Sequence, residues 1–126
     1  MEYEVIQLPK LVAYYVLADG NGVELDTQRR LVLKHTEETQ SQLIADFFEH
    51  LSDKRADIKE AELKEAVGVC KTHSAKLAVA AFDDMPRKFR FIMTLLCNGV
   101  DCVVIRGQRS GSCAVQASEL IGEFWR

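Results

Sequence analysis

Apolar residues recur along most of this chain at spacings of three and four, the spacing that places side chains on one face of an α-helix. The first stripe predicts a helix from about Leu8, with Pro9 in its first turn and Gly20 just after its end. A second helix is predicted from a cap at Asp26 or Thr27. Its later half carries apolar residues four apart, namely Leu43, Ile44, Phe47, Phe48 and Leu51. The polar stretch from His35 to Gln42 is either an exposed turn of one long helix or a break between two helices.

The longest apolar stripe lies in the middle of the chain and predicts a helix over about residues 58–82. Asp57 and Glu60 supply a D-x-x-E capping arrangement at its start. Pro86 suits the first turn of the next helix, which Gly99 ends. A last helix is predicted from the apolar face formed by Ala114, Ala117, Ile121 and Phe124.

These elements predict an all-α fold, a single domain over residues 1–126 with five or six helices around one core. The chain has 126 residues, of which 48% are hydrophobic, enough for such a core without metal or disulfide support. An α+β fold is the alternative, because residues 3–7 and the β-branched run 102–105 could each form a short strand.

The charge and the apolar content of the chain exclude some classes of partner. The chain carries 16 Lys and Arg against 19 Asp and Glu, a net charge of −3, so nucleic acid is not an expected partner. No apolar run approaches the roughly 20 residues that cross a bilayer, and the acidic N-terminus is unlike a signal peptide. We therefore expect a cytoplasmic protein with no membrane contact and with reduced cysteines.

An oxygen-rich loop, residues 19–26, connects the first two predicted helices. Asp19 and Asp26 supply the carboxylates that hard divalent cations prefer. The loop is not an EF-hand, because Glu24 stands at the position of the loop glycine and Arg30 at that of the last glutamate. A weaker cation site and a plain helix connection both remain open.

Residues 8–32 resemble the TerB-like tellurite-resistance family. An apolar predicted helix ends in Ala18-Asp19-Gly20 and is followed by a hydrophobic position and an acidic helix start. The resemblance implies a small, all-helical, cytosolic protein with a stress-response or regulatory role. It also makes Asp19 and Asp26 the candidate ligands of a divalent cation.

Two further groups of residues could either bind a ligand or serve only the structure. Cys70 and His73 lie one helical turn apart and could hold a soft metal with Cys97 and Cys102, although a hydrogen-bonded core histidine explains His73 equally. The glycine-flanked loop 107–111 leads into a predicted helix. Backbone amides there, with Arg109, could hold a small anion, or the segment is a simple surface loop.

No nucleophile and base can be paired by their spacing, so we expect neither an enzyme nor a cofactor; a cysteine-dependent enzyme is the minority alternative. The leading hypothesis is a protein-interaction module that binds another protein or a second copy of itself. The alternative is an ion- or small-anion-binding domain that uses loop 19–26 or loop 107–111. The candidate contact residues are Tyr14, Arg87, Arg90, Arg109 and Trp125.

Overall fold

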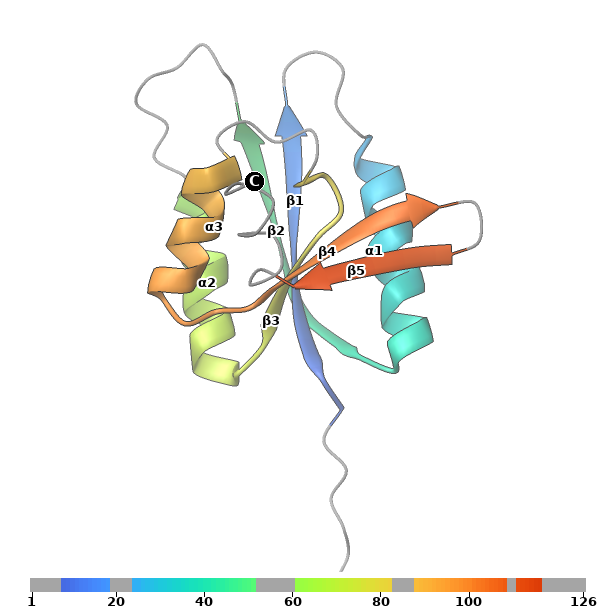
Figure 1. The fold of residues 1–126 in the computed structure, drawn as a ribbon, viewed down its shortest axis with the longest axis horizontal. Helices are drawn as coiled ribbons and strands as arrows, with labels where there is room; N and C mark the ends of the chain where they lie inside the picture. Colours follow the sequence, from blue (N-terminus) through green and yellow to red (C-terminus); the bar gives the residue numbers. More distant parts are fainter. Residues whose placement is uncertain (1–7, 19–23, 52–60, 83–87, 109–110, 117–126) are drawn as a thin grey trace, which may run out of the picture.

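The computed structural model describes residues 8–18, 24–51, 61–82, 88–108 and 111–116 of the chain. Within these ranges strands and helices mostly alternate (Figure 1). In chain order the elements are β1 (Lys10–Ala18), α1 (Leu25–Thr39), β2 (Gln42–Leu51), α2 (Ala61–His73), β3 (Lys76–Val79), α3 (Lys88–Cys97), β4 (Cys102–Gln108) and β5 (Gly111–Gln116).

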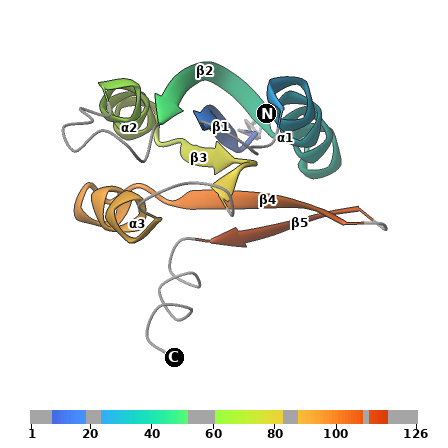
Figure 2. The same cartoon turned by 90° about the horizontal axis from the view of Figure 1, so that it is seen from above.

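The strands form one sheet in the order β2-β1-β3-β4-β5. The first four of these are parallel, and β5 returns antiparallel to β4. Parallel neighbours need crossover connections, and the helices supply them. Figures 1 and 2 show α1 on one side of the sheet and both α2 and α3 on the other. The fold is therefore a three-layer α/β sandwich.

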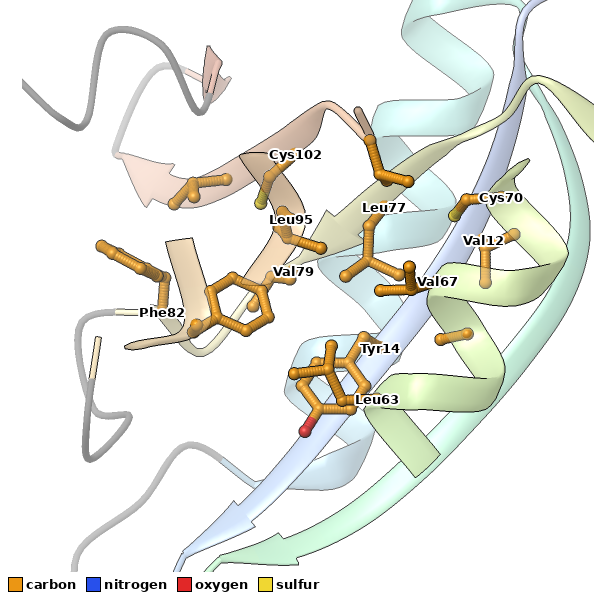
Figure 3. Packing of buried hydrophobic residues seen from close by; sticks show 14 of the residues in the cluster. Val12, Tyr14, Leu63, Val67, Cys70, Leu77, Val79, Phe82, Leu95 and Cys102 are labelled. Carbon is orange, nitrogen blue, oxygen red and sulfur yellow. The ribbon is translucent and has the colours of Figure 1, made fainter. Parts of the chain in front are cut away.

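Each face of the sheet has its own apolar core, because successive side chains of a strand point to opposite faces. The larger core lies between the sheet and α2 and α3, and Figure 3 shows part of it. Its strand residues include Val12, Tyr14, Leu77, Val79, Cys102 and Val104, and its helix residues include Leu63, Val67, Cys70, Phe91, Ile92 and Leu95. The smaller core, under α1, contains Leu11, Ala13, Tyr15, Val32, Ala78, Val103 and Ile105.

The prediction of an all-α bundle of five or six helices is wrong. The segment expected to form the first helix is β1, whose residues Leu11 to Val16 are all buried. A strand covered on both faces is a continuous apolar run, and such a run contains the three- and four-residue spacings of a helix. The TerB-like resemblance implied an all-helical fold, and the α/β structure contradicts that implication as well.

Three other predicted helices contain strands. The second predicted helix ends at Thr39, and the apolar stripe beyond it is β2. The long helix predicted over residues 58–82 ends at His73 and is followed by β3, with Ser74 at a φ of 54° marking the change of direction. The last predicted helix is wrong over residues 111–116, which form β5, and its later part lies outside the described residues.

Other predictions agree with the structure. A helix begins near the predicted position, but α1 starts at Leu25 with Glu24 at the N-cap, so the prediction of a cap at Asp26 or Thr27 is wrong because both residues lie inside the helix. α3 spans Lys88–Cys97 before the break at Gly99. The minority alternative of a strand over residues 102–105 is confirmed within β4. The other strand of that alternative, residues 3–7, lies outside the described part of the chain.

Candidate functional site

The sheet reverses its winding direction at β1. The chain passes from β1 through α1 to β2 on one side, and then through α2 to β3 on the other side. In open α/β sheets, ligands bind outside the carboxyl ends of the strands at such a point. Pairing between β1 and β3 extends only from Leu11 to Ala13, whereas β1 continues to Ala18. The two strands therefore separate toward this edge.

Gln28 of α1 occupies the separation between β1 and β3. Its side chain is fully buried. The Gln28 Nε2 donates to the Val16 carbonyl oxygen at 2.8 Å, and the Val16 N–H donates to Gln28 Oε1 at 3.0 Å. The amide thus replaces a neighbouring strand at this position and ties α1 to the end of β1. Sequence reasoning missed it, because a glutamine near the start of a helix gives no sign of burial.

Tyr14 and Glu49 form a second polar link near the same edge. The Tyr14 hydroxyl donates to Glu49 Oε1 at 2.6 Å, and the same carboxylate accepts the backbone N–H groups of Glu62 (3.1 Å) and Leu63 (3.2 Å). Unpaired N–H groups and the helix dipole make the start of α2 a favourable place for a carboxylate. This link joins β1, β2 and α2.

Tyr14 itself is part of the core rather than of a contact surface. It is 1% exposed, and its ring stacks on Phe91 with centroids 5.8 Å apart (Figure 3 shows Tyr14 among the core residues). The prediction of Tyr14 as a contact residue is therefore wrong. The two adjacent tyrosines point to opposite faces of β1, which a helical interpretation could not reveal.

A cluster of one cation and two aromatic rings lies on the α1 side of β1 and β2. The Arg29 guanidinium carbon is 5.1 Å from the Phe48 ring centroid and 6.0 Å from that of Tyr15. The two rings are 5.3 Å apart. Tyr15 is buried, whereas Phe48 is 36% exposed. We call Arg29, Tyr15, Asp46 and Phe48 the Arg29–Phe48 surface.

The charges of this surface act on the Tyr15 hydroxyl. Burial raises the pKa of Tyr15 above 10.0, the negative charge of Asp46 raises it further, and Arg29 opposes the rise. Tyr15 is therefore neutral at physiological pH, and its ring lies near one cation, Arg29, and one anion, Asp46. Sequence reasoning missed this surface because it assigned Phe48 to a helix.

The outward face of α3 carries a second candidate surface. Phe89 is 49% exposed and Met93 is 37% exposed. They border a hollow of about 530 Å³, which we call the α3 hollow. Its lining residues are Phe89, Arg90, Met93, Thr94, Cys97 and Asn98. The predicted contact residue Arg90 therefore lies on an apolar, exposed face, whereas Arg87 lies outside the described residues.

A second hollow, of about 440 Å³, lies at the opposite edge of the sheet, where β3 and β4 begin. Its lining includes Cys70, Lys71, Lys76, Asn98 and Asp101. Two lysines and one aspartate line the same space, so both signs of charge are present.

Among the described residues, Cys70 and His73 differ in their surroundings, and the metal site considered for them stays a prediction without support. Cys70 and Cys102 are buried, whereas His73 is exposed at the end of α2. Burial raises the pKa of the Cys70 thiol to about 11, and burial also raises that of Cys102, helped by the charges of Cys70 and Asp101. Such thiols are protonated and poorly reactive at neutral pH. Among the described residues, no three His, Cys, Asp or Glu side chains gather as a metal site.

The structure bears differently on the two predicted ion-binding loops, residues 19–26 and 107–111. Asp26 is exposed in the first turn of α1, but Asp19 lies outside the described residues, so their cation site stays a prediction. Loop 107–111 joins β4 to β5 and leads into a strand, so the helix N-terminus that was expected to bind an anion does not follow it. Arg109 and Trp125 lie outside the described residues.

In the described ranges, every helix is too short or too polar to cross a membrane.

No family model matches the sequence, and no curated protein does either. Among solved structures, the N-terminal catalytic domain of the TP901-1 integrase is similar to this chain, with a TM-score of 0.59. The two are 15% identical, and the match covers 92% of this chain and 87% of the integrase domain. At this identity the likeness establishes the fold, so the chain shares the α/β architecture of an integrase catalytic domain.

Proposed function

We propose that this chain is a non-enzymatic protein-interaction module built on the integrase-type α/β fold. The observation that carries the proposal is the stacking of Arg29 on Phe48 and Tyr15, beside an exposed part of the sheet. We assign the Arg29–Phe48 surface as its contact site.

The composition of this surface suits a protein partner. Arginine and aromatic residues are enriched among the few residues that dominate binding energies at protein interfaces. The rings hold Arg29 in place, so less side-chain entropy is lost when a partner binds. Asp46 is exposed next to this cluster and supplies a charged rim.

The position of β2 adds a second means of recognition. β2 is at the end of the strand order and pairs with β1 alone within the described sheet. An edge strand presents unpaired backbone groups to which an extended segment of a partner can add. The Arg29–Phe48 surface lies beside this edge, so one partner could contact both.

The residues after β1 and β3 support a role without catalysis. These segments follow the carboxyl ends of the two central strands, where sites on such folds lie. Residues 19–24 and 83–87 contain no serine, threonine, cysteine or tyrosine, the side chains that most often attack a phosphate or a carbonyl.

The contact site is tested by capturing partners with three immobilised baits. The baits are the wild type, Phe48→Lys, and Glu65→Lys, which introduces the same residue at an exposed position of α2. We expect one set of proteins on the wild type and on Glu65→Lys, and its loss on Phe48→Lys. Thermal melts establish that all three are folded. Equal capture by the three baits would contradict the assigned surface.

The absence of catalysis needs a separate assay. Supercoiled plasmid is incubated with the purified chain, with and without magnesium, and examined for nicks and for protein covalently attached to DNA. We expect neither product above the level seen with heat-denatured protein. Nicking or a covalent adduct would show that the chain is an enzyme.

A further inference from the structure

We propose that β2 pairs antiparallel with β2 of a second copy of this chain and so places Asp46 of each copy beside Arg29 of the other. β2 lies at the outer margin of the described sheet, between α2 and α1 (Figure 2). The inference rests on the proposed function, because it names the partner of the Arg29–Phe48 surface. Its test has a different readout, so the two can fail separately.

The sequence of β2 leaves the free edge of this strand open to pairing. Natural edge strands commonly carry lysine, proline or a bulge, each of which hinders the addition of another strand. β2 contains no proline, lysine or arginine in its ten residues. Its pairing with β1 is irregular at Ile44 and regular from Ala45 to Leu51. The regular part is long enough for several backbone hydrogen bonds to a second strand.

Two-fold symmetry brings the same face of both copies together. Antiparallel pairing of two identical edges places the two-fold axis perpendicular to the sheet, so the α1 side of one copy continues into the α1 side of the other. Asp46 and Phe48 belong to this side, because they pair with Ala13 and Tyr15 of the core under α1. α1 packs mainly over β1 and β4, and both β2 side chains remain exposed. They are therefore accessible to a second copy.

The charges of this surface are complementary to themselves. Arg29 and Asp46 are both exposed, and within the described part of the chain neither of them forms an ion pair. One copy therefore offers a cation and an anion on the same side of the sheet, close to the edge of β2. A two-fold axis at that edge turns the cation of each copy toward the anion of the other.

The positions of these charges select the register. When Phe47 lies opposite Phe47 of the second copy, Asp46 lies opposite Phe48. Directly opposite residues have Cβ atoms about 4.5–5.5 Å apart. The Arg29 guanidinium carbon is 5.1 Å from the Phe48 ring centroid, so this register forms two Arg29–Asp46 pairs in each dimer. A register with Asp46 opposite itself would place like charges together and is disfavoured.

Charge reversal tests the partner and the register together. Arg29→Asp would face Asp46 of the second copy, and Asp46→Arg would face Arg29, so each variant repels its own kind. In sedimentation equilibrium, we expect the wild-type mass to rise with concentration from 14.2 kDa toward twice that value. Each variant should raise the dissociation constant of the dimer about tenfold. Lys64→Asp, the same change of charge at an exposed position of α2, should associate like the wild type.

An equimolar mixture of Arg29→Asp and Asp46→Arg should regain wild-type association, because both pairs of the mixed dimer again join opposite charges. A mixture that associates no better than either variant alone would overturn the proposal. A wild type that stays monomeric would also overturn it, whereas loss of capture on Phe48→Lys would then still support the contact surface. Equal capture by the three baits, together with a charge-sensitive dimer, would overturn only the binding of other proteins.

Hydrogen exchange of the unaltered chain provides a second measurement if a variant does not fold. Backbone N–H groups on the free edge of β2 are hydrogen-bonded in the dimer and open to solvent in the monomer. Residues 45–49 should exchange about tenfold more slowly where dimer exceeds monomer by about ten to one. Residues of α3 should exchange equally at low and high concentration. Unchanged exchange of residues 45–49, or slowing confined to another element, would overturn the proposal.

Discussion

The side-chain amide of Gln28 makes hydrogen bonds to both the N–H and the carbonyl oxygen of Val16, at 3.0 and 2.8 Å. Between Leu11 and Ala13, the edge of β1 is paired by β3. Beyond that point the helix side chain takes over the same role. One glutamine therefore keeps the end of the central strand paired and places α1 on the sheet.

Replacing Gln28 with methionine should destabilise the fold strongly. The substitution keeps the length of the side chain but leaves two buried backbone groups of Val16 without partners, each at a cost of about 1–3 kcal/mol. We expect the free energy of unfolding, measured in urea, to fall by about 2–6 kcal/mol. Gln42→Met, at an exposed position of β2, should change it by less than about 0.5 kcal/mol. Similar losses in both variants would contradict this role of Gln28.

The contact between Tyr14 and Glu49 should be measurable as a coupling energy. Tyr14→Phe keeps the stack on Phe91 and loses one hydrogen bond, so it should cost about 0.5–1.5 kcal/mol. Glu49→Ala also removes the acceptor of the first N–H groups of α2 and should cost about 1–3 kcal/mol. The double variant should lose less than the sum, because both changes remove the same hydrogen bond. Strict additivity would show that this bond contributes nothing to stability.

The pH dependence of stability should contain a contribution from His35. Burial lowers the pKa of His35 below 6.5, and the negative charge of Glu38 opposes the shift. The unfolded chain therefore takes up this proton at a higher pH than the folded chain. The stabilisation is complete above pH 6.5 and is lost as the pH falls through the lower, folded-state pKa.

His35→Gln removes this proton uptake, so its unfolding free energy should fall less steeply than that of the wild type below pH 6.5. The difference in slope is at most about 1.4 kcal/mol per pH unit for one proton. The measurement is a series of urea titrations across this range. Identical slopes for His35→Gln and the wild type would exclude His35 as the source.

Parts of this fold could be predicted where local signals and tertiary structure agree. The polar residues near Asp26 indicated the region in which α1 begins, although Glu24 stands at the N-cap in place of Asp26 or Thr27. α3 lies between Pro86 and Gly99, so both helices were predicted from the sequence. The β-branched run at residues 102–105 also indicated a strand. These signals depend on neighbouring residues alone.

The strands covered on both faces could not be distinguished from helices. β1 is apolar at every position from Leu11 to Val16, because helices cover both faces of the sheet. The polar alternation that marks a half-buried strand is therefore missing.

Gln28 and Glu49 were missed for a different reason. Their importance comes from partners 12 and 35 residues away in the chain, and no local pattern records such pairs.

Two glycines should respond with opposite signs to the same substitution. A Cβ added at Gly68, within α2, or at Gly99, after α3, would meet no atom within 4 Å, so steric contact does not distinguish them. The backbone does: Gly99 has a φ of +67°, whereas Gly68 is helical. Gly68→Ala should raise the free energy of unfolding by about 0.5–1 kcal/mol, because alanine favours the helix.

Gly99→Ala should lower the free energy of unfolding by about 1–2 kcal/mol, the cost of a Cβ in the left-handed region. Gly99→Asn should fall between alanine and the wild type, because a short polar side chain tolerates this conformation better. Urea unfolding of the four proteins then gives the order Gly68→Ala, wild type, Gly99→Asn, Gly99→Ala, from most to least stable. If Gly99→Ala were as stable as the wild type, the positive φ would not be what requires glycine after α3, and the chain would be free to rearrange there.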